Sequence, residues 1–174
     1  MENTGSPKLI IWLTGISGSG KSSIASELTK YFEPCTWLDG DTLRQTVNSD
    51  LGFTKAGRLE AARRAVQLAL KSAQTGVTIC SLITPYRESR DAARALAHRE
   101  GVRFAEVYVR CSIETAAQRD PKGLYARHKA GYMTGLTGVD DPYEPPVDPV
   151  ITVDTEKLSI QESVYQIRHT LDQT

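Results

Sequence analysis

The stretch KLIIWLTGISGSGKSS, residues 8–23, decides the fold of this 174-residue chain. Residues 8–14 are mostly apolar, as expected of a strand that is buried on both faces of a sheet. Residues 15–22 fit the pattern G-x-x-x-x-G-K-[ST], and residues 21–32 are typical of a helix. A strand, a glycine-rich turn and a helix in this order predict a loop whose backbone N–H groups bind phosphate. The alternative is an ordinary glycine-rich turn.

Strands and helices continue to alternate along the chain. We expect further strands at residues 36–39, 77–84, 102–109 and 150–154, and helices at 57–75, 87–100 and 160–172. Gly76 is the expected C-cap of the helix before it. The pattern predicts an α/β fold with a mostly parallel five-stranded sheet flanked by helices, joined by right-handed crossovers. In such sheets ligands bind beyond the carboxyl ends of the strands.

Length and composition indicate one globular domain over residues 1–174. Lysine plus arginine and aspartate plus glutamate both number 21, and this zero net charge argues against a nucleic-acid partner. No apolar run has the length of a membrane span, and MENTGSPK at the N-terminus lacks the parts of a signal peptide. Cys35, Cys80 and Cys111 are far apart, which favours reduced, buried thiols. We therefore expect a cytoplasmic protein without a membrane partner.

The phosphate loop, residues 15–22, predicts the binding of ATP and Mg²⁺. The Lys21 ammonium can reach the β- and γ-phosphates, and the Ser22 hydroxyl can ligate Mg²⁺. The expected ATP-binding residues of this region are Gly15, Ser17, Gly18, Ser19, Gly20, Lys21, Ser22 and Ser23. The motif does not identify the group that accepts the phosphate.

Two aspartates, Asp39 and Asp41, follow the second expected strand and should face the same sheet edge as the phosphate loop. A kinase needs a carboxylate there to accept the proton of an attacking hydroxyl and to hold the water shell of the metal ion. The third strand ends in SLIT, residues 81–84, without an acidic residue, which favours a metal role for the aspartate pair. The alternative is that Asp41 is only the N-cap of the next helix.

Residues 120–149 interrupt the alternation of strands and helices. They contain four glycines, and four prolines lie between Pro142 and Pro149. A long irregular segment inside a compact domain is often functional. We expect a lid that shields the reacting phosphate from water.

Four stretches together resemble the adenylylsulfate kinase (APS kinase) family: GISGSGKSS (15–23), LDGDTLRQTVNSDLGF (38–53), SLITPYRESRDAAR (81–94) and RDPKGLYARHKAGYMTGLTGVDDPYEPP (119–146). The resemblance covers roughly residues 8–172, nearly the whole chain. It implies a P-loop kinase fold with a lid, a substrate region at 39–64 and a homodimer. It also implies that ATP phosphorylates the ribose 3′-hydroxyl of adenosine 5′-phosphosulfate (APS) to give PAPS, the activated sulfate donor of sulfate assimilation.

The resemblance assigns roles to single residues. Asp41 becomes the base and Asp39 assists at the metal or ribose, so the expected catalytic residues are Asp41, Lys21 and Asp39, and the expected metal ligands Ser22 and Asp41. The implied substrate-binding residues are Asp39, Asp41, Arg44, Asn48, Phe53, Arg58, Ile83, Lys122, Gly123, Leu124 and Leu136. Arg119 would lie over the ATP phosphates, and Thr155 is a further candidate for the ATP side.

The chemistry of two of these side chains suits the implied acceptor. The planar guanidinium of Arg44 fits a charged phosphosulfate, and the ring of Phe53 can stack on a base. Phe53 could instead be a core residue, and Arg58, Arg63 and Arg64 could form a solvated helix face.

Three positions depart from the family pattern. Ala61 replaces an asparagine that helps hold the substrate nucleotide, Leu136 replaces a phenylalanine that stacks on its base, and TPY at residues 84–86 replaces SPF. Compensated drift is one interpretation. A different acceptor, such as cytidine diphosphoramidate in capsule modification, is another. A nucleotide-binding switch without turnover is a third, although such a protein would not need Asp41 as a base.

Overall fold

The computed structural model describes residues 8–174. Residues 1–7 lie outside the described residues. They include most of MENTGSPK, the N-terminal stretch that lacks the parts of a signal peptide, and the start of the expected domain. The strands are β1 (Leu9–Thr14), β2 (Cys35–Asp39), β3 (Val77–Ser81), β4 (Arg103–Arg110) and β5 (Ile151–Asp154). The helices are α1 (Lys21–Leu28), the 3₁₀ turn η1 (Thr29–Tyr31), α2 (Gly40–Gln45), α3 (Lys55–Ser72), α4 (Arg87–Arg99), α5 (Ile113–Arg119), α6 (Leu124–Lys129) and α7 (Ile160–Gln173).

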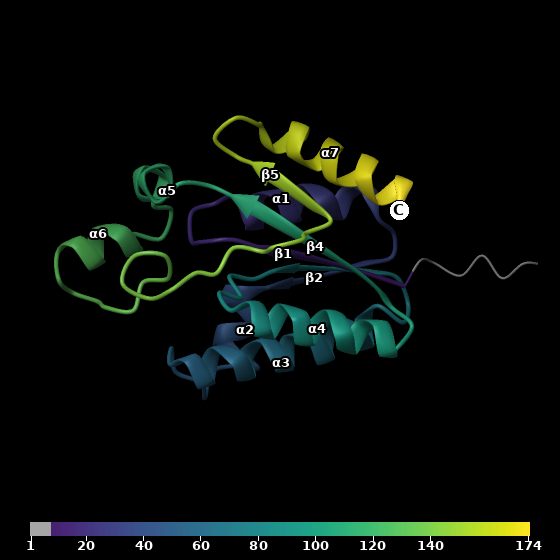
Figure 1. Cartoon of the computed structure of the whole chain (residues 1–174), viewed down its shortest axis with the longest axis horizontal. Helices are drawn as coiled ribbons and strands as arrows, with labels where there is room; N and C mark the ends of the chain where they lie inside the picture. The colour runs from purple at the N-terminus through teal and green to yellow at the C-terminus, as the bar shows by residue number, and fades with distance from the viewer. Residues whose placement is uncertain (1–7) are drawn as a thin grey trace, which may run out of the picture.

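The five strands form one parallel sheet in the order β2-β3-β1-β4-β5. Figure 1 shows α1 and α7 on one face of this sheet and α2, α3 and α4 on the other. Every residue of the central strand β1 is buried, because helices cover both of its faces. The predicted α/β fold with a parallel five-stranded sheet is thus confirmed.

A hydrophobic core fills each face of the sheet. Alternate residues of β1 point to opposite faces, so Ile11 packs toward α1 and α7 while Trp12 packs toward α3 and α4. Each fully buried aliphatic side chain of this kind contributes ~1.5–3 kcal/mol relative to an exposed one. The two cores hold the carboxyl ends of β1, β2 and β3 at a common edge.

Some element boundaries differ from the sequence-based expectation. Helix α1 ends at Leu28 and continues as η1, and β3 ends at Ser81 instead of residue 84. The prediction that Gly76 caps a helix is wrong, because Ala73 is the C-cap of α3. A Cβ atom at position 76 would lie 2.3 Å from the carbonyl oxygen of Pro34, so the close approach of that backbone requires glycine there.

The segment 120–149 contains α6, which the sequence did not predict, besides irregular stretches. Figure 1 shows α5 and α6 beyond the carboxyl ends of the strands, at one end of the molecule. A small apolar cluster of Ile16, Ala116, Tyr125 and Leu136 ties this segment to the phosphate loop. The segment 120–149, called the lid segment below, therefore packs next to the phosphate loop.

Two further expectations concern the location of the protein. Between residues 8 and 174, no helix is long and apolar enough to pass through a membrane. All three cysteines are free, but only Cys80 is buried, while Cys35 and Cys111 are partly exposed. The expectation of buried thiols is therefore correct for one cysteine of three.

Candidate functional site

The phosphate loop joins β1 to α1 at the carboxyl edge of the sheet. Gly15 passes so close to β4 that a Cβ atom there would lie 2.4 Å from the carbonyl oxygen of Val109. Gly20 is the N-cap of α1, which begins at Lys21. The first N–H groups of α1 are therefore available to phosphate oxygens, and Ser23 is exposed on the same first turn.

The ammonium group of Lys21 is folded back onto the loop. Its Nζ atom donates to the carbonyl oxygen of Ile16 at 2.7 Å and to the Ser19 hydroxyl at 3.3 Å, and the residue is 8% exposed. Burial, together with the smaller effect of the Lys122 charge, lowers the pKa of Lys21 to about 7, although the carboxylates of Asp41 and Asp39 oppose the shift. A polyphosphate would therefore meet a cation that is poorly solvated and already aimed at the loop.

Asp39 is fixed by three neighbours at the end of β2. Its Oδ1 atom accepts hydrogen bonds from the hydroxyls of Ser81 at 2.8 Å and Ser22 at 3.0 Å, and its Oδ2 atom accepts from the Asp41 backbone N–H at 3.1 Å. Asp39, not Asp41, is therefore the N-cap of α2, and the alternative that Asp41 caps this helix is wrong. Partial burial raises the pKa of Asp39, but the hydrogen bonds outweigh burial and leave it below the usual value.

Asp41 lies in the first turn of α2 and is exposed. Its carboxylate forms an ion pair with Lys122, which precedes α6 in the lid segment. The two aspartates thus differ in their surroundings. Asp39 is held by the fold, whereas Asp41 meets a long and flexible cation from the lid.

Phe53 lies on the surface between two arginines. Its side chain is 64% exposed, so the alternative that Phe53 is a core residue is wrong. The guanidinium carbons of Arg44 and Arg58 lie 4.6 Å and 5.6 Å from the centre of its ring. Burial lowers the pKa of Arg44, and the charge of Arg58 lowers it further. An aromatic face and two cations are therefore assembled on one surface.

Both arginines are held by backbone carbonyl groups. Arg44 donates to Leu51 at 3.1 Å and Arg58 donates to Phe53 at 3.0 Å. The buried Arg58 also donates to Gly135 of the lid segment at 3.1 Å. By contrast, Arg63 and Arg64 pair with Glu60 on the solvated side of α3, in agreement with a structural role.

Asn48 and Ile83 occupy less open positions. Asn48 is buried, and its Oδ1 atom has no hydrogen-bond partner within residues 8–174. Ile83 is half-buried just beyond β3, and its carbonyl oxygen accepts a hydrogen bond from the Thr14 hydroxyl at 2.6 Å. An unpaired buried amide oxygen is costly and therefore points to a partner that the free chain does not supply.

Arg119 and Thr155 meet over the phosphate loop. Arg119 donates to the carbonyl oxygens of Gly18 at 3.3 Å and Thr155 at 2.7 Å. The Thr155 hydroxyl donates in turn to the carbonyl oxygen of Ser19 at 2.9 Å. The fold thus brings these two residues, which are 36 positions apart, to the loop that the sequence assigned to ATP.

The remaining lid residues are half-buried or buried. Gly123 is the N-cap of α6 and Leu124 is its half-buried first residue. Leu136 is only 4% exposed and packs with Ile16 and Tyr125. Packing in this small cluster is therefore its evident role, and contact with a nucleotide stays a prediction.

Sequence reasoning missed two lid contacts that shape the site. The Tyr125 hydroxyl donates to the carbonyl oxygen of Ser17 at 2.8 Å, which ties the lid to the phosphate loop. Asp141 lies 2.8 Å from the Arg58 guanidinium and ties the lid to α3. Tyr125 lies inside the KGLY motif and could have been singled out. The Arg58–Asp141 pair joins distant segments and carries no local signal.

A magnesium ion fits the oxygen atoms at the phosphate loop. The Ser22 hydroxyl and the Asp39 carboxylate are 3.0 Å apart, and both are hard oxygen donors. No group of three or more His, Cys, Asp or Glu that could hold a metal occurs among residues 8–174. Mg²⁺ does not need one, since it keeps water and phosphate ligands. The hydrogen bond between Ser22 and Asp39 favours Asp39 as the second residue at the metal. The sequence predicted Asp41 in this position.

Comparison with known proteins agrees with this geometry. A family model described as adenylylsulphate kinase matches residues 7–154. A protein named adenylyl-sulfate kinase from Geotalea uraniireducens is 43% identical, with 95% of this chain and 81% of that protein covered.

The solved structures that resemble the fold include two described as APS kinases. An APS kinase from Mycobacterium tuberculosis in complex with AMPPNP and APS has a TM-score of 0.89 and 36% identity, with 97% of this chain and 98% of that chain covered. A chain described as a hexameric APS kinase from Thiobacillus denitrificans has a TM-score of 0.71 and 31% identity. It is covered over 29% of its length and matches 95% of this chain.

Proposed function

The chain belongs to the adenylylsulphate kinase family, and we propose that it transfers the γ-phosphoryl group of ATP to the ribose 3′-hydroxyl of APS. The oxygen of the 3′-hydroxyl forms a bond to the γ-phosphorus, the bond from that phosphorus to the β-phosphate oxygen breaks, and ADP leaves. The proton of the hydroxyl goes to a carboxylate. The products are PAPS and ADP.

We infer that the phosphate loop and Arg119 hold the donor. The backbone N–H groups at the start of α1 and the Lys21 ammonium would bind the β- and γ-phosphates. Arg119, which bonds Gly18 and Thr155, would lie over the same phosphates. Bound Mg²⁺ would neutralise charge on the transferring phosphate, and Ser22 and Asp39 would hold it or its water shell.

The acceptor would bind on the side of Phe53. Its base would stack on the exposed ring, and Arg44 and Arg58 would bind its phosphosulfate group. Asn48, whose Oδ1 atom is buried and unpaired within the described residues, can accept a hydrogen bond from the acceptor nucleotide. Asp41 would then accept the proton of the 3′-hydroxyl once Lys122 leaves it.

One observation carries the proposal. The same sheet edge presents a phosphate loop bonded to a carboxylate, Ser22 to Asp39, and an aromatic ring flanked by two arginines. A binding module for ATP alone has no need of the second group. The pair of sites fits the transfer of phosphate to a nucleotide that carries a strongly acidic group.

ADP release with Mg-ATP and a panel of acceptors tests the proposal. The panel contains APS, AMP and cytidine and uridine 5′-diphosphate analogues, including cytidine diphosphoramidate. We expect fast turnover with APS alone, which would make Ala61 and Leu136 compensated changes. Turnover restricted to a cytidine or uridine acceptor would overturn the acceptor and retain the mechanism.

The variant Asp41→Asn separates a kinase from a nucleotide-binding switch. We expect kcat to fall by ~10²–10⁴, the usual contribution of a general base, with unchanged ATP affinity by calorimetry. Asp172→Asn, on the exposed end of α7, is the matched control and should leave both quantities unchanged. Full turnover in the Asp41 variant would remove this carboxylate from the mechanism.

We further propose that the phosphate loop (15–22), the substrate region (39–64) and the lid (120–149) act within one domain that forms a homodimer in the cytoplasm. Contacts from the lid to Ser17 and Arg58 support the first point. The free thiols suit a reducing compartment. Sedimentation equilibrium distinguishes a dimer from a monomer or from a hexamer like the one described for the Thiobacillus denitrificans protein. Cell fractionation tests the location.

A further inference from the structure

The stretch RESRDAAR, residues 87–94, belongs to the pattern that identifies the family but has no part in the site described above. It forms the first half of α4. One of its arginines, Arg90, is 1% exposed, although a buried guanidinium is expensive unless every donor is engaged. This burial calls for an explanation.

The Arg90 guanidinium bonds three segments that are far apart in the sequence. Its Nε atom donates to Glu106 of β4 at 2.7 Å, and its Nη1 atom donates to the carbonyl oxygen of Thr84 at 2.6 Å. Its Nη2 atom donates to the carbonyl oxygen of Glu144 in the lid segment at 2.6 Å. The ion pair with Glu106 supplies the balancing charge. The other two donors hold the backbone carbonyl groups of Thr84, next to Ile83, and of Glu144 in the lid segment.

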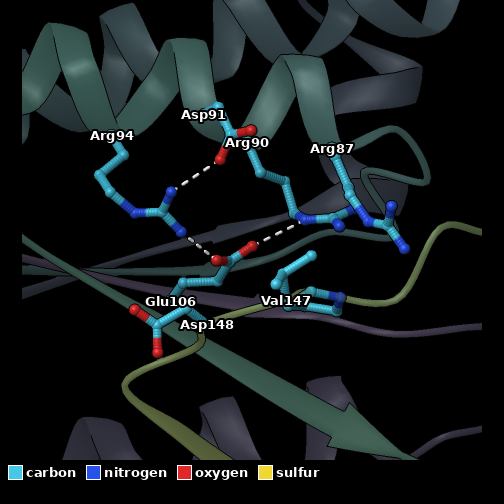
Figure 2. A pocket seen from close by; sticks show the side chains of 8 residues that line it. Arg87, Arg90, Asp91, Arg94, Glu106, Val147 and Asp148 are labelled. Atoms are coloured by element: carbon cyan, nitrogen blue, oxygen red, sulfur yellow. Dashed lines mark hydrogen bonds and ion pairs between the residues drawn. The ribbon is translucent and has the colours of Figure 1, made fainter.

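Figure 2 shows how the neighbouring arginines differ from Arg90. Arg90 and Arg94 both extend from α4 toward Glu106, while Arg87 points away from it. Arg94 shares the Glu106 carboxylate and also bonds Asp91, and 40% of its side chain is exposed. Arg94 has no hydrogen bond to Thr84 or Glu144 among those of the described residues. It is therefore a natural control for Arg90.

The backbone that Arg90 holds at Thr84 is strained. Thr84 has a φ of +39°, which is unusual for a β-branched residue and persists only when neighbours fix it. Its hydroxyl accepts a hydrogen bond from Trp12 at 3.1 Å. The residue before it, Ile83, belongs to the proposed acceptor site. The conformation of this loop thus depends on a bond to its side chain and a bond to its carbonyl group.

The lid segment is held at the same place. Tyr143 stands next to Glu144, and its hydroxyl lies 2.9 Å from the hydroxyl of Thr14, which directly precedes the phosphate loop. The Arg90 guanidinium carbon lies 5.9 Å from the centre of the Tyr143 ring. The loop after β3, the lid and the end of β1 therefore meet around one buried cation.

We propose that Arg90 is a positioning residue for the kinase reaction, which sets the loop at residues 83–86 and the lid segment 143–146 in register with each other. This inference rests on the proposed function, because it assumes that Ile83 and the lid enclose the acceptor. Arg90 is buried and is not among the residues proposed to contact either substrate. Its effect on turnover passes through the two carbonyl groups that it holds.

The variant Arg90→Lys tests this role, because a lysine keeps the charge near Glu106 but cannot bond three segments in a fixed fork. We expect KM for the acceptor to rise at least tenfold, with the dissociation constant for ATP within about twofold of the wild type. Arg94→Lys should change neither quantity by more than about threefold. Equal effects of the two variants, or an equal loss of ATP and acceptor affinity, would overturn the proposal.

Amide hydrogen exchange supplies a readout that needs no turnover. Arg90→Lys should speed exchange in residues 82–86 and 143–149 together, and Arg94→Lys should not. If the wild-type protein shows no turnover with any acceptor, the proposed function is refuted. Hydrogen exchange would still test whether Arg90 holds the two segments. Unchanged exchange in either segment would refute that role.

If Arg90→Lys does not accumulate as folded protein, Tyr143→Phe takes its place. This change removes only the hydroxyl that joins the lid segment to Thr14. We expect an increase of about two- to fivefold in KM for the acceptor and no change in ATP affinity. An unchanged KM for the acceptor would then contradict the proposal that acceptor binding depends on the relative position of the loop 83–86 and the lid segment 143–146.

Discussion

The proposed donor half of the site, at the phosphate loop, and the proposed acceptor half, around Phe53 and Asp41, are built in different ways. On the donor side, Lys21 is 8% exposed and Ser19 is fully buried, and the loop is held by Lys21, Arg119 and Tyr125. On the acceptor side, Phe53 is 64% exposed and Asp41 is exposed as well. The donor half is thus largely preformed, whereas the acceptor half presents its side chains to solvent.

This contrast separates what the fold requires from what the substrate requires. The phosphate loop is continuous with the central strand β1, so a change there disturbs the core of the sheet. Phe53 precedes α3 at the surface and packs mainly on arginines. Acceptor specificity can therefore change at little cost to the fold, while the donor half cannot drift in the same way.

Among the changes that test this contrast between the two halves, Lys21→Met in the donor half has the largest expected effect. Loss of a charged group aimed at the transferring phosphate should lower kcat by ~10²–10³. Because burial already disfavours the ammonium, we expect the melting temperature of the nucleotide-free protein to stay the same or rise. Steady-state kinetics and calorimetric melting measure the two quantities. A fall in both would mean that Lys21 stabilises the fold.

The acceptor half is broken by Phe53→Ala. Loss of one stacked ring costs ~1–3 kcal/mol, so KM for the acceptor should rise by ~5–150-fold, with KM for ATP unchanged. The melting temperature should change little, because the ring is exposed. Tyr165→Ala on α7, whose side chain is 66% exposed, is the matched control. A large drop in stability would show that Phe53 has a structural role.

The contrast sharpens with pH, because Lys21 has a pKa of about 7 before nucleotide binds. A bound polyphosphate raises this pKa, so binding takes up a proton above pH 7. ATP affinity should therefore be highest below pH 7 and fall by up to about tenfold per pH unit above it. Calorimetry in buffers of different ionisation enthalpy measures the uptake. Lys21→Met should abolish this uptake, whereas the Phe53 variant should keep it.

The smallest effect is expected from Ala61→Asn, which restores the family side chain on α3. One added hydrogen bond is worth ~0.5–1.5 kcal/mol, so KM for the acceptor should fall by ~2–12-fold. Ala92→Asn, on the exposed side of α4, has the same helix propensity cost and should leave KM unchanged. A rise in KM for the Ala61 variant would indicate that the acceptor differs from the one proposed.

Local patterns predicted the sheet and the phosphate loop because a strand, a loop and a helix follow one another directly in residues 8–32. The neighbours of Asp39 could not be predicted in this way. Its bond to Ser81 depends on the pairing of β2 with β3, which sets Asp39 opposite Ser81. The alternative that Asp41 caps α2 fails for this reason, because the pairing places Asp39 at the N-cap.

For Phe53 the sequence left a core position open beside the stacking role, and for Leu136 it did not predict burial. Both are apolar, and neither lies in a periodic stretch that distinguishes one face from another. Their environments depend on where the lid lies relative to Ile16 and α3. The ion pair between Arg58 and Asp141 has the same origin, since it joins two segments that only the folded chain brings together.

The ion pair between Lys122 and Asp41 bears on ATP hydrolysis in the absence of the acceptor. A kinase loaded with ATP before its acceptor arrives is at risk of passing the phosphate to water. While the Asp41 carboxylate is paired with Lys122, it would be occupied and not available to a stray water molecule. The acceptor, by drawing Lys122 toward its own negative charge, would release the carboxylate at the moment when a hydroxyl is in place. In the proposed mechanism the lid would therefore make futile hydrolysis slow and would tie the use of ATP to the presence of its intended recipient.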